Sequence, residues 1–367
     1  MNHAPVSRRS FISTTGVLPA LGAAEMPVLE ASDRIVEFLP APSKVHIVTA
    51  TASSVVPPPR YSADEVHRIC GGSKDVKFTI PSNAAEVQQL LPEADVIFGS
   101  ITAEMLKEAK NLRWLQATEA GMERVLFPEL VQSPVAVTNM ARVFAPGISE
   151  TAIGMLLGLT RGFNSYFYPQ FQQKHWQLRR NLVEVSGMTM GIVGLGGIGS
   201  AIAVKAHYGF DMRVLAVDPK PMTKPIFVDT LREPGWLTEM VPQVDVLVSA
   251  APATRETEKL FNETVFRAMK KTAYFLNVSR GWLVDSNALA RALKEEWIAG
   301  AGVDVADQEP APPDHPFYQC PNLILTCHSA GFSPERQVRL VALLAENVRR
   351  YTSGLPLLNV VDKKRGY

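Results

Sequence analysis

Residues 190–200 read Met190-Gly191-Ile192-Val193-Gly194-Leu195-Gly196-Gly197-Ile198-Gly199-Ser200, and this segment is the strongest indication of the fold. Its apolar start is typical of a buried parallel strand, and residues 201–206 have a helical pattern. Between them Gly194, Gly196 and Gly199 have the spacing GxGxxG. The first glycine permits a tight turn, the second lets the backbone approach a pyrophosphate, and the third lets the helix pack closely on the strand. The helix N-terminus then offers N–H groups to the phosphates.

An acidic residue follows the next predicted strand. Residues 213–217 form that strand, and Asp218 lies 19 positions after Gly199. An acid at about this distance accepts a hydrogen bond from the ribose 2′-hydroxyl of NAD and repels the 2′-phosphate of NADP. The alternative is a structural turn followed by a chance acid. The strand–turn–helix context favours a dinucleotide site, and we expect NAD as the cofactor.

Composition and charge narrow the class of protein. The chain has 367 residues, 46% of them hydrophobic, which is enough for two domains with a substantial core. A formal net charge of +1 argues against a nucleic-acid-binding surface. Three cysteines without a CxxC pair indicate neither a disulfide framework nor a zinc site, and we expect no metal. No apolar run is long enough to insert stably in a membrane.

Residues 1–40 differ from the rest. Arg8-Arg9 precedes Phe11, and the mildly apolar run 17–24 ends in small residues. A basic start, a short apolar middle and a small-residue end describe a secretory signal, and the paired arginines resemble a twin-arginine signal. We therefore expect export to the periplasm. The alternative is a disordered extension on a cytoplasmic protein.

The chain from residue 41 onward alternates strand and helix, which predicts an α/β fold with parallel sheets. A long helix over 148–161, with Ser149 as candidate N-cap, separates a first, smaller domain from the dinucleotide domain. The predicted strands of the first domain are 45–49, 76–80, 95–99, 114–117 and 135–138, and the later ones are 244–250, 273–278, 299–305 and 323–326.

Polar residues follow several of these strands. Ala120 and Gly121 follow the fourth strand, where their backbone N–H groups can hold a carboxylate, although an ordinary turn is an equal alternative. Arg280, Glu309 and His328 come after three later strands. A guanidinium binds a 2-oxo acid through paired hydrogen bonds, a histidine exchanges a proton near neutral pH, and a carboxylate orients that imidazole. Singly, each has an ordinary structural explanation.

Together with their flanks these residues resemble a known family. Residues 277–285 (NVSRGWLVD), 302–310 (GVDVADQEP) and 326–331 (TCHSAG) are similar to three motifs of the D-isomer-specific 2-hydroxyacid dehydrogenases, and so is the tail from Asn359. The resemblance implies a Rossmann-type doubly wound NAD domain, 149–334, inserted into a smaller flavodoxin-like parallel domain. That substrate domain comprises 41–148 and is completed by 335–367. It also implies an active site in the cleft, hydride transfer between NAD(H) and a D-2-hydroxy/2-oxo acid, and a homodimer.

The resemblance assigns roles position by position. Arg280 binds the substrate, Glu309 supports the histidine, and His328 is the acid/base. Ala120 and Gly121 match the loop that binds the substrate carboxylate. The positions that contact the dinucleotide are Gly194, Gly196, Gly197, Ile198, Gly199, Asp218, Pro252, Thr257, Val278, Ser279, Arg280, Asp304, His328, Ala330 and Gly331.

Departures from the family pattern bear on the substrate. Cys327 replaces the usual proline before the histidine, 251–254 (APAT) replaces a more usual PLT, and Glu119 stands where a small uncharged residue is usual. Glu309 disfavours formate dehydrogenase, which has glutamine there. The sequence does not name the acid, and phosphite is a remote alternative. A further alternative is an NAD-sensing binding protein of the corepressor type on the same fold.

Overall fold

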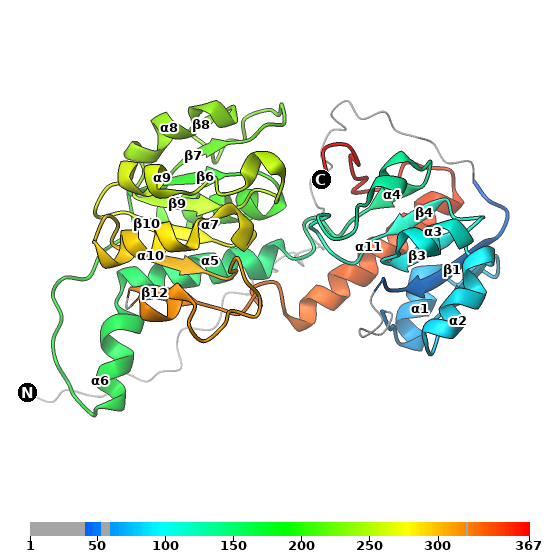
Figure 1. The fold of residues 1–367 in the computed structure, drawn as a ribbon, viewed down its shortest axis with the longest axis horizontal. Coiled ribbons are helices and arrows are strands. Elements are labelled where there is room, and N and C mark those ends of the chain that lie inside the picture. The colour runs from blue at the N-terminus through cyan, green and yellow to red at the C-terminus, as the bar shows by residue number, and fades with distance from the viewer. Residues whose placement is uncertain (1–40, 53–58, 321) are drawn as a thin grey trace, which may run out of the picture. The chain divides into compact units, whose positions relative to one another are not determined.

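The computed structural model describes residues 41–52, 59–320 and 322–367. The predicted export segment, 1–40, therefore lies outside the described residues. The described chain contains two parallel sheets flanked by helices, which confirms the predicted α/β class (Figure 1).

The first sheet has the strand order β2-β1-β3-β4-β5 with every pairing parallel. This is the flavodoxin-like order, in which the sheet grows outward on both sides of its first strand. All five predicted strands are present within one or two residues of their expected bounds. They are β1 (Val45–Ala50), β2 (Val76–Thr79), β3 (Val96–Gly99), β4 (Trp114–Gln116) and β5 (Ala136–Thr138).

Both faces of this sheet are covered. Helices α2 (Ala84–Leu90), α3 (Ala103–Glu108) and α4 (Pro128–Gln132) contribute to the core on one face. On the other face lie α1 (Ala63–Cys70) and α11 (Pro334–Thr352). Because α11 comes from the far end of the chain, the core of the first sheet is built from two separate stretches of sequence.

The second sheet has the order β12-β11-β10-β9-β6-β7-β8, the doubly wound order of dinucleotide-binding folds. Six of its strands were expected. The seventh, β8, is a three-residue edge strand that is only partly buried, so its sequence carries little strand signal. The strands are β6 (Thr189–Val193), β7 (Arg213–Val217), β8 (Thr230–Arg232), β9 (Val246–Ser249), β10 (Tyr274–Asn277), β11 (Gly300–Val303) and β12 (Leu323–Leu325).

Helices α5 (Ala145–Thr160) and α7 (Gly197–Phe210) cover one face of the second sheet. The other face is covered by α8 (Leu237–Met240), α9 (Glu263–Ala268) and α10 (Ser286–Lys294). A π-helical turn (Phe163–Phe167) and α6 (Tyr168–Gln172) follow α5. Short 3-10 turns occupy Leu91–Glu93, Pro234–Trp236, Val241–Gln243, Arg255–Thr257, Gly281–Leu283 and Pro316–Gln319. No helix in the described part of the chain has both the length and the apolarity needed to cross a bilayer.

The prediction that Ser149 caps the long helix is wrong. Helix α5 begins at Ala145, and the buried Ser149 lies inside its first turns, where its hydroxyl donates to the carbonyl of Pro146 at 2.8 Å. A proline in the first turn has a preset helical φ and no N–H to lose. It therefore starts the helix earlier than the serine does.

Candidate active site

The loop after β6 has the shape that its three glycines predict. Gly194 has a φ of 92°, and a Cβ there would lie 2.7 Å from Cα of Ala251. A Cβ on Gly199 would overlap the carbonyl oxygen of Gly194, so α7 approaches the strand closely. A Cβ on Gly196 would meet no atom of the described residues within 4 Å apart from its neighbours in the chain, which leaves space in front of the helix N-terminus. The loop therefore fits a pyrophosphate held by backbone N–H groups.

Asp218 joins the end of β7 to this loop. One carboxylate oxygen accepts from the backbone N–H of Leu195 at 2.8 Å, and the other accepts from that of Lys220 at 2.8 Å. A carboxylate has about four acceptor positions, so two remain for ribose hydroxyls. A cavity of about 530 Å³ opens beside Asp218, and its lining includes Lys220, Lys224 and Arg232.

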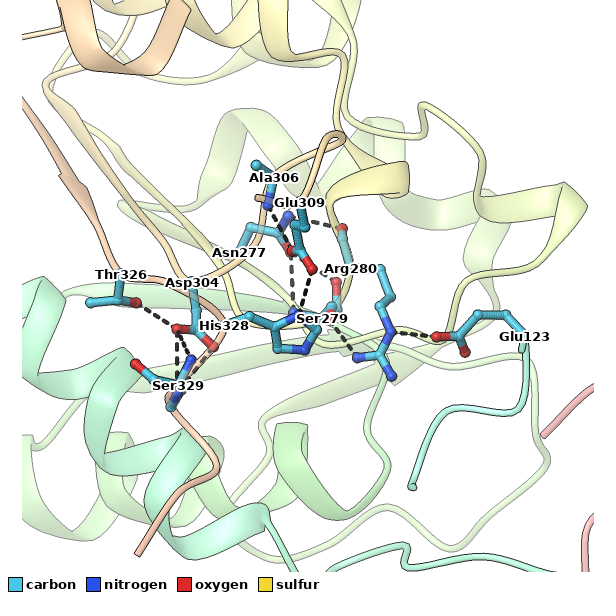
Figure 2. Close-up of polar contacts among 11 residues, drawn as sticks. Glu123, Asn277, Ser279, Arg280, Asp304, Ala306, Glu309, Thr326, His328 and Ser329 are labelled. Atoms are coloured by element: carbon cyan, nitrogen blue, oxygen red, sulfur yellow. Dashed lines mark hydrogen bonds and ion pairs between the residues drawn. The ribbon is translucent and has the colours of Figure 1, made fainter. Parts of the chain in front are cut away.

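Arg280 is held in place through its backbone. Asn277, at the end of β10, is only 1% exposed and donates from Nδ2 to the carbonyl of Arg280 at 3.0 Å. Its amide oxygen accepts from the N–H and the hydroxyl of Ser279, at 3.2 and 2.8 Å (Figure 2). The hydroxyls of Ser279 and Ser249 lie 2.7 Å apart. This buried network fixes the turn from which the guanidinium extends.

The Arg280 side chain reaches the loop after β4. Nη1 donates to the carbonyl of Ser279 at 2.9 Å, and Nε donates to Oε1 of Glu123 at 2.7 Å (Figure 2). A Cβ on Gly121 would overlap Nη2. The structure thus brings Arg280 to the predicted carboxylate-binding loop of Ala120 and Gly121, and that close approach requires glycine at 121.

His328 and Glu309 form a pair. Nδ1 of His328 lies 2.7 Å from Oε2 of Glu309, while Oε1 accepts from the N–H of Ala306 at 3.1 Å (Figure 2). The imidazole is 46% exposed and sits on a residue with a φ of 54°. With Nδ1 directed at the carboxylate, Nε2 is the nitrogen available to a substrate.

Asp304, at the end of β11, holds the segment that carries His328. The carboxylate is 4% exposed and accepts from the Thr326 hydroxyl at 2.6 Å and from the backbone N–H groups of Ser329 and Ala330 at 3.0 and 3.2 Å. Its own carbonyl accepts from the N–H of His328 at 2.7 Å. These bonds fix the histidine where the family's proline is replaced by Cys327, whose side chain is exposed.

The other predicted dinucleotide positions occupy the same loops. The hydroxyl of Thr257 donates to the carbonyl of Pro252 at 2.8 Å, which closes the turn after β9. Val278 and Ala330 are buried, and a Cβ on Gly331 would lie 3.3 Å from the ring of Phe144. Gly197 and Ile198 form the first turn of α7.

Two residues of this arrangement had no role in the sequence-based prediction. Asn277 stands inside a recognised motif, but its amide bonds to Ser279 and Arg280 are visible only in the structure. Glu123 lies two residues beyond Gly121. The sequence signal that could have drawn attention to it is an acidic residue in a loop that is expected to bind an anion. Glu119, the acid that was noticed, has an exposed side chain. Within the described ranges, no group of three or more His, Cys, Asp or Glu side chains is placed to hold a metal ion.

Comparison with known proteins points to one family. Residues 153–330 match the family described as "D-isomer specific 2-hydroxyacid dehydrogenase, NAD binding domain". A glyoxylate reductase of Thermofilum pendens is 33% identical over 276 residues, which cover 73% of this chain and 81% of the relative.

Comparison with solved structures points to the same family. A D-isomer specific 2-hydroxyacid dehydrogenase family protein from Aeromonas salmonicida has a TM-score of 0.73 and 29% identity, covering 88% of this chain and 100% of that one. An NADPH-dependent glyoxylate/hydroxypyruvate reductase from Sinorhizobium meliloti, in complex with NADP and sulfate, has a TM-score of 0.72 at 23% identity, with coverage of 88% and 100%, and this likeness shows the fold. The glycine loop, its NAD-binding domain match and these relatives together place the chain in the family of D-isomer-specific 2-hydroxyacid dehydrogenases, enzymes that use a nicotinamide dinucleotide.

Proposed function

We propose that the chain reduces a short 2-oxo acid of the glyoxylate or hydroxypyruvate type to the corresponding 2-hydroxy acid, which is the D isomer where the product is chiral. The observation that carries this proposal is the 2.7 Å pair of His328 and Glu309 on the strand edge that also carries Arg280. The curated relative that is named a glyoxylate reductase supports the choice of substrate.

Arg280 and the loop at Gly121 bind the acid in this proposal. A planar guanidinium offers two parallel N–H groups to a carboxylate and the neighbouring carbonyl oxygen. Backbone N–H groups of Ala120 and Gly121 complete the site, because Nη2 of Arg280 lies directly against Gly121. The carbonyl carbon is then fixed in one orientation.

His328 supplies the proton. The glycine loop after β6 and Asp218 would hold a nicotinamide dinucleotide, which would supply or accept the hydride at carbon C2. As the carbonyl oxygen gains negative charge, Nε2 of His328 donates its proton to that oxygen, and in the reverse direction it removes the hydroxyl proton. Glu309 keeps Nδ1 engaged, holds the ring in position and stabilises the charge of the imidazolium.

Steady-state assays test this function. The full-length protein is assayed with glyoxylate, hydroxypyruvate, pyruvate and phosphohydroxypyruvate, each with NADH and with NADPH, by loss of absorbance at the nicotinamide band. We expect turnover of at least one short monocarboxylic acid. Binding of NADH without oxidation by any acid would instead favour the non-catalytic NAD sensor.

Export and dimerisation extend the proposal to the cell. Arg8-Arg9 supports export by the twin-arginine route, and fractionation of cells that express the chain or its Arg8→Lys/Arg9→Lys variant tests it. If both proteins remain cytoplasmic at full size, the export proposal fails.

Exposed aromatic side chains between 163 and 176 support a homodimer, because apolar patches of this kind mark protein interfaces.

A further inference from the structure

The loop after β4 places a carboxylate on the arginine that the proposed function assigns to the substrate. Oε1 of Glu123 accepts from Nε of Arg280 at 2.7 Å, and each side chain is 30% exposed. The pair is thus partly shielded from water, which strengthens the attraction between the two charges. The reaction proposed above gives no task to this carboxylate.

Glu123 lies on the edge of the guanidinium that binds a carboxylate best. Nε and Nη2 form that edge, and their parallel N–H groups match the two oxygens of a carboxylate. Oε1 of Glu123 sits on Nε. A Cβ on Gly121 would lie 2.5 Å from Oε2 of Glu123 and would overlap Nη2, so these two atoms share the space beside Gly121. Nη1, on the other side, donates to Ser279.

We propose that Glu123 is a specificity-determining residue, a carboxylate built into the chain that occupies the anion position on Arg280 and is exchanged for the carboxylate of the substrate. This inference rests on the proposed function, in which Arg280 binds a 2-oxo acid. Because Glu123 competes from within the same molecule, it lowers the apparent affinity for every carboxylate that uses Arg280.

The exchange also selects among acids. After displacement the carboxylate of Glu123 can move only as far from Arg280 as its short side chain allows. Its negative charge therefore stays beside the bound substrate. A second carboxylate on the substrate meets that charge and is repelled, whereas an uncharged substituent is not. The residue therefore favours short monocarboxylic 2-oxo acids over dicarboxylic ones such as oxaloacetate.

The test compares two carboxylate-to-amide variants. Glu123→Gln removes the charge from the pair. Glu129→Gln removes an equal charge from an exposed side chain in the first turn of α4, for which no side-chain hydrogen bond or ion pair is recorded among the described residues. Each protein is assayed for kcat and KM with glyoxylate and oxaloacetate. Calorimetry with oxamate, a monocarboxylate that is not reduced, gives the Kd of the complex with NADH.

We expect Glu123→Gln to lower the KM for glyoxylate and the Kd for oxamate about fivefold, which is the scale of one partly exposed ion pair, with kcat within twofold. The KM for oxaloacetate should fall further. The Glu129→Gln protein should stay within twofold of the parent in all of these values. Glu123→Ala, which cannot bond Arg280 at all, should change the values in the same direction and serves if the amide variant folds poorly.

Opposite changes would overturn the inference. A rise in KM together with a fall in kcat would show that Glu123 orients Arg280 for the substrate. Equal gains in both amide variants would show a general effect of negative charge near the site. If the parent reduces no 2-oxo acid, the proposed function fails on its own. The oxamate Kd values still decide the exchange, because they require no turnover: a gain for Glu123→Gln supports it and no gain refutes it.

Discussion

The Glu309 carboxylate serves two partners with its two oxygens. Oε1 accepts from the backbone of Ala306, and Oε2 faces Nδ1 of His328. The first contact fixes the rotamer of the acid, so that the second directs the imidazole. A histidine that is 46% exposed would otherwise turn freely in water.

This pairing makes a prediction about catalysis. Glu309→Gln keeps the shape of the side chain but removes the carboxylate that faces Nδ1 of His328. Because the imidazole loses the partner that orients it, kcat/KM for 2-oxo acid reduction should fall, but by less than in His328→Ala. His328→Ala should lose about 10²–10⁴-fold in kcat/KM. Arg280→Lys should mainly raise KM, because an ammonium lacks the planar fork.

Steady-state kcat and KM of these variants measure the effect. Asp314→Asn, an exposed acid on the same loop as Glu309, is the matched control and should follow the parent. A Glu309→Gln protein with the kcat and KM of the parent would mean that the pair does not operate in catalysis.

Asp218 predicts the choice of cofactor. Its carboxylate stands at the end of β7, where NADP carries an additional phosphate, and like charges there repel. We expect kcat/KM for NADH to exceed that for NADPH about tenfold or more. Asp218→Asn should bring the ratio of kcat/KM for NADH to that for NADPH closer to one. The positive charges of Lys220, Lys224 and Arg232, which line the adjoining cavity, would then attract the additional phosphate.

The ratio is measured in one assay with both reduced cofactors. Asp211→Asn, at the C-terminal end of α7, removes a charge elsewhere in the second lobe, which is the part of the chain built on the second sheet. It should leave the ratio of the two kcat/KM values unchanged. Equal kcat/KM values for NADH and NADPH in the parent would refute the preference.

The sequence contains enough information to predict much of the candidate site, but not its contacts. Arg280, Glu309 and His328 could be predicted because each stands beyond a strand in a motif whose residue types suit one chemistry. The pairing of Glu123 with Arg280 could not be predicted, because 157 positions separate them and no local pattern links a loop acid to a distant guanidinium.

At the scale of elements, strong hydrophobic patterns could be predicted and weak ones could not. The buried strands β6, β9 and β10 each have four or more consecutive buried or nearly buried residues, which leaves a clear apolar signature. The edge strand β8 has none. The start of α5 was mispredicted because Pro146 and Ser149 are both typical of helix N-termini. Which of the two marks the actual start depends on packing.

The docking of α11 on the first sheet yields a prediction about stability. Tyr351 is buried, its ring centre lies 5.4 Å from that of Trp114, and burial raises the pKa of Tyr351 to about 12. Among the described residues its hydroxyl has no hydrogen-bond partner. Tyr351→Phe should therefore keep or raise the free energy of unfolding, because an unsatisfied buried hydroxyl costs about 1–3 kcal/mol.

Tyr351→Ala should instead lower the free energy of unfolding by about 3–5 kcal/mol, since it leaves a cavity against Trp114. Urea or thermal unfolding of the two variants measures both values. A Phe variant that loses more than about 1 kcal/mol would indicate that the hydroxyl is satisfied after all.

At the scale of the whole molecule, the segment after α5 predicts the oligomeric state. Trp176 is fully exposed and Phe171 is 79% exposed, whereas most large apolar side chains of the second lobe are buried. We expect a homodimer by light scattering, and we expect Phe171→Glu/Trp176→Glu to shift it toward monomer because a charge cannot be buried unpaired at an apolar interface.

Tyr318→Glu places one charge of the same sign at an exposed aromatic position outside that segment and should leave the mass unchanged. A parent protein that is monomeric at assay concentration would refute the homodimer. A double variant that stays dimeric would place the interface on another surface.

The first lobe, which is built on the first sheet, is interrupted in sequence by the second lobe. This interruption also sets an order for folding during synthesis. One face of the first sheet is covered by α11, which contributes Leu340, Leu344 and Val348 to the core and is translated after the whole second lobe. The ribosome therefore delivers a first sheet with this face covered only in part, by α1, and then makes a second lobe whose seven strands are contiguous in sequence. The second lobe can close by itself, whereas the first lobe keeps part of its apolar face uncovered until the last helix emerges.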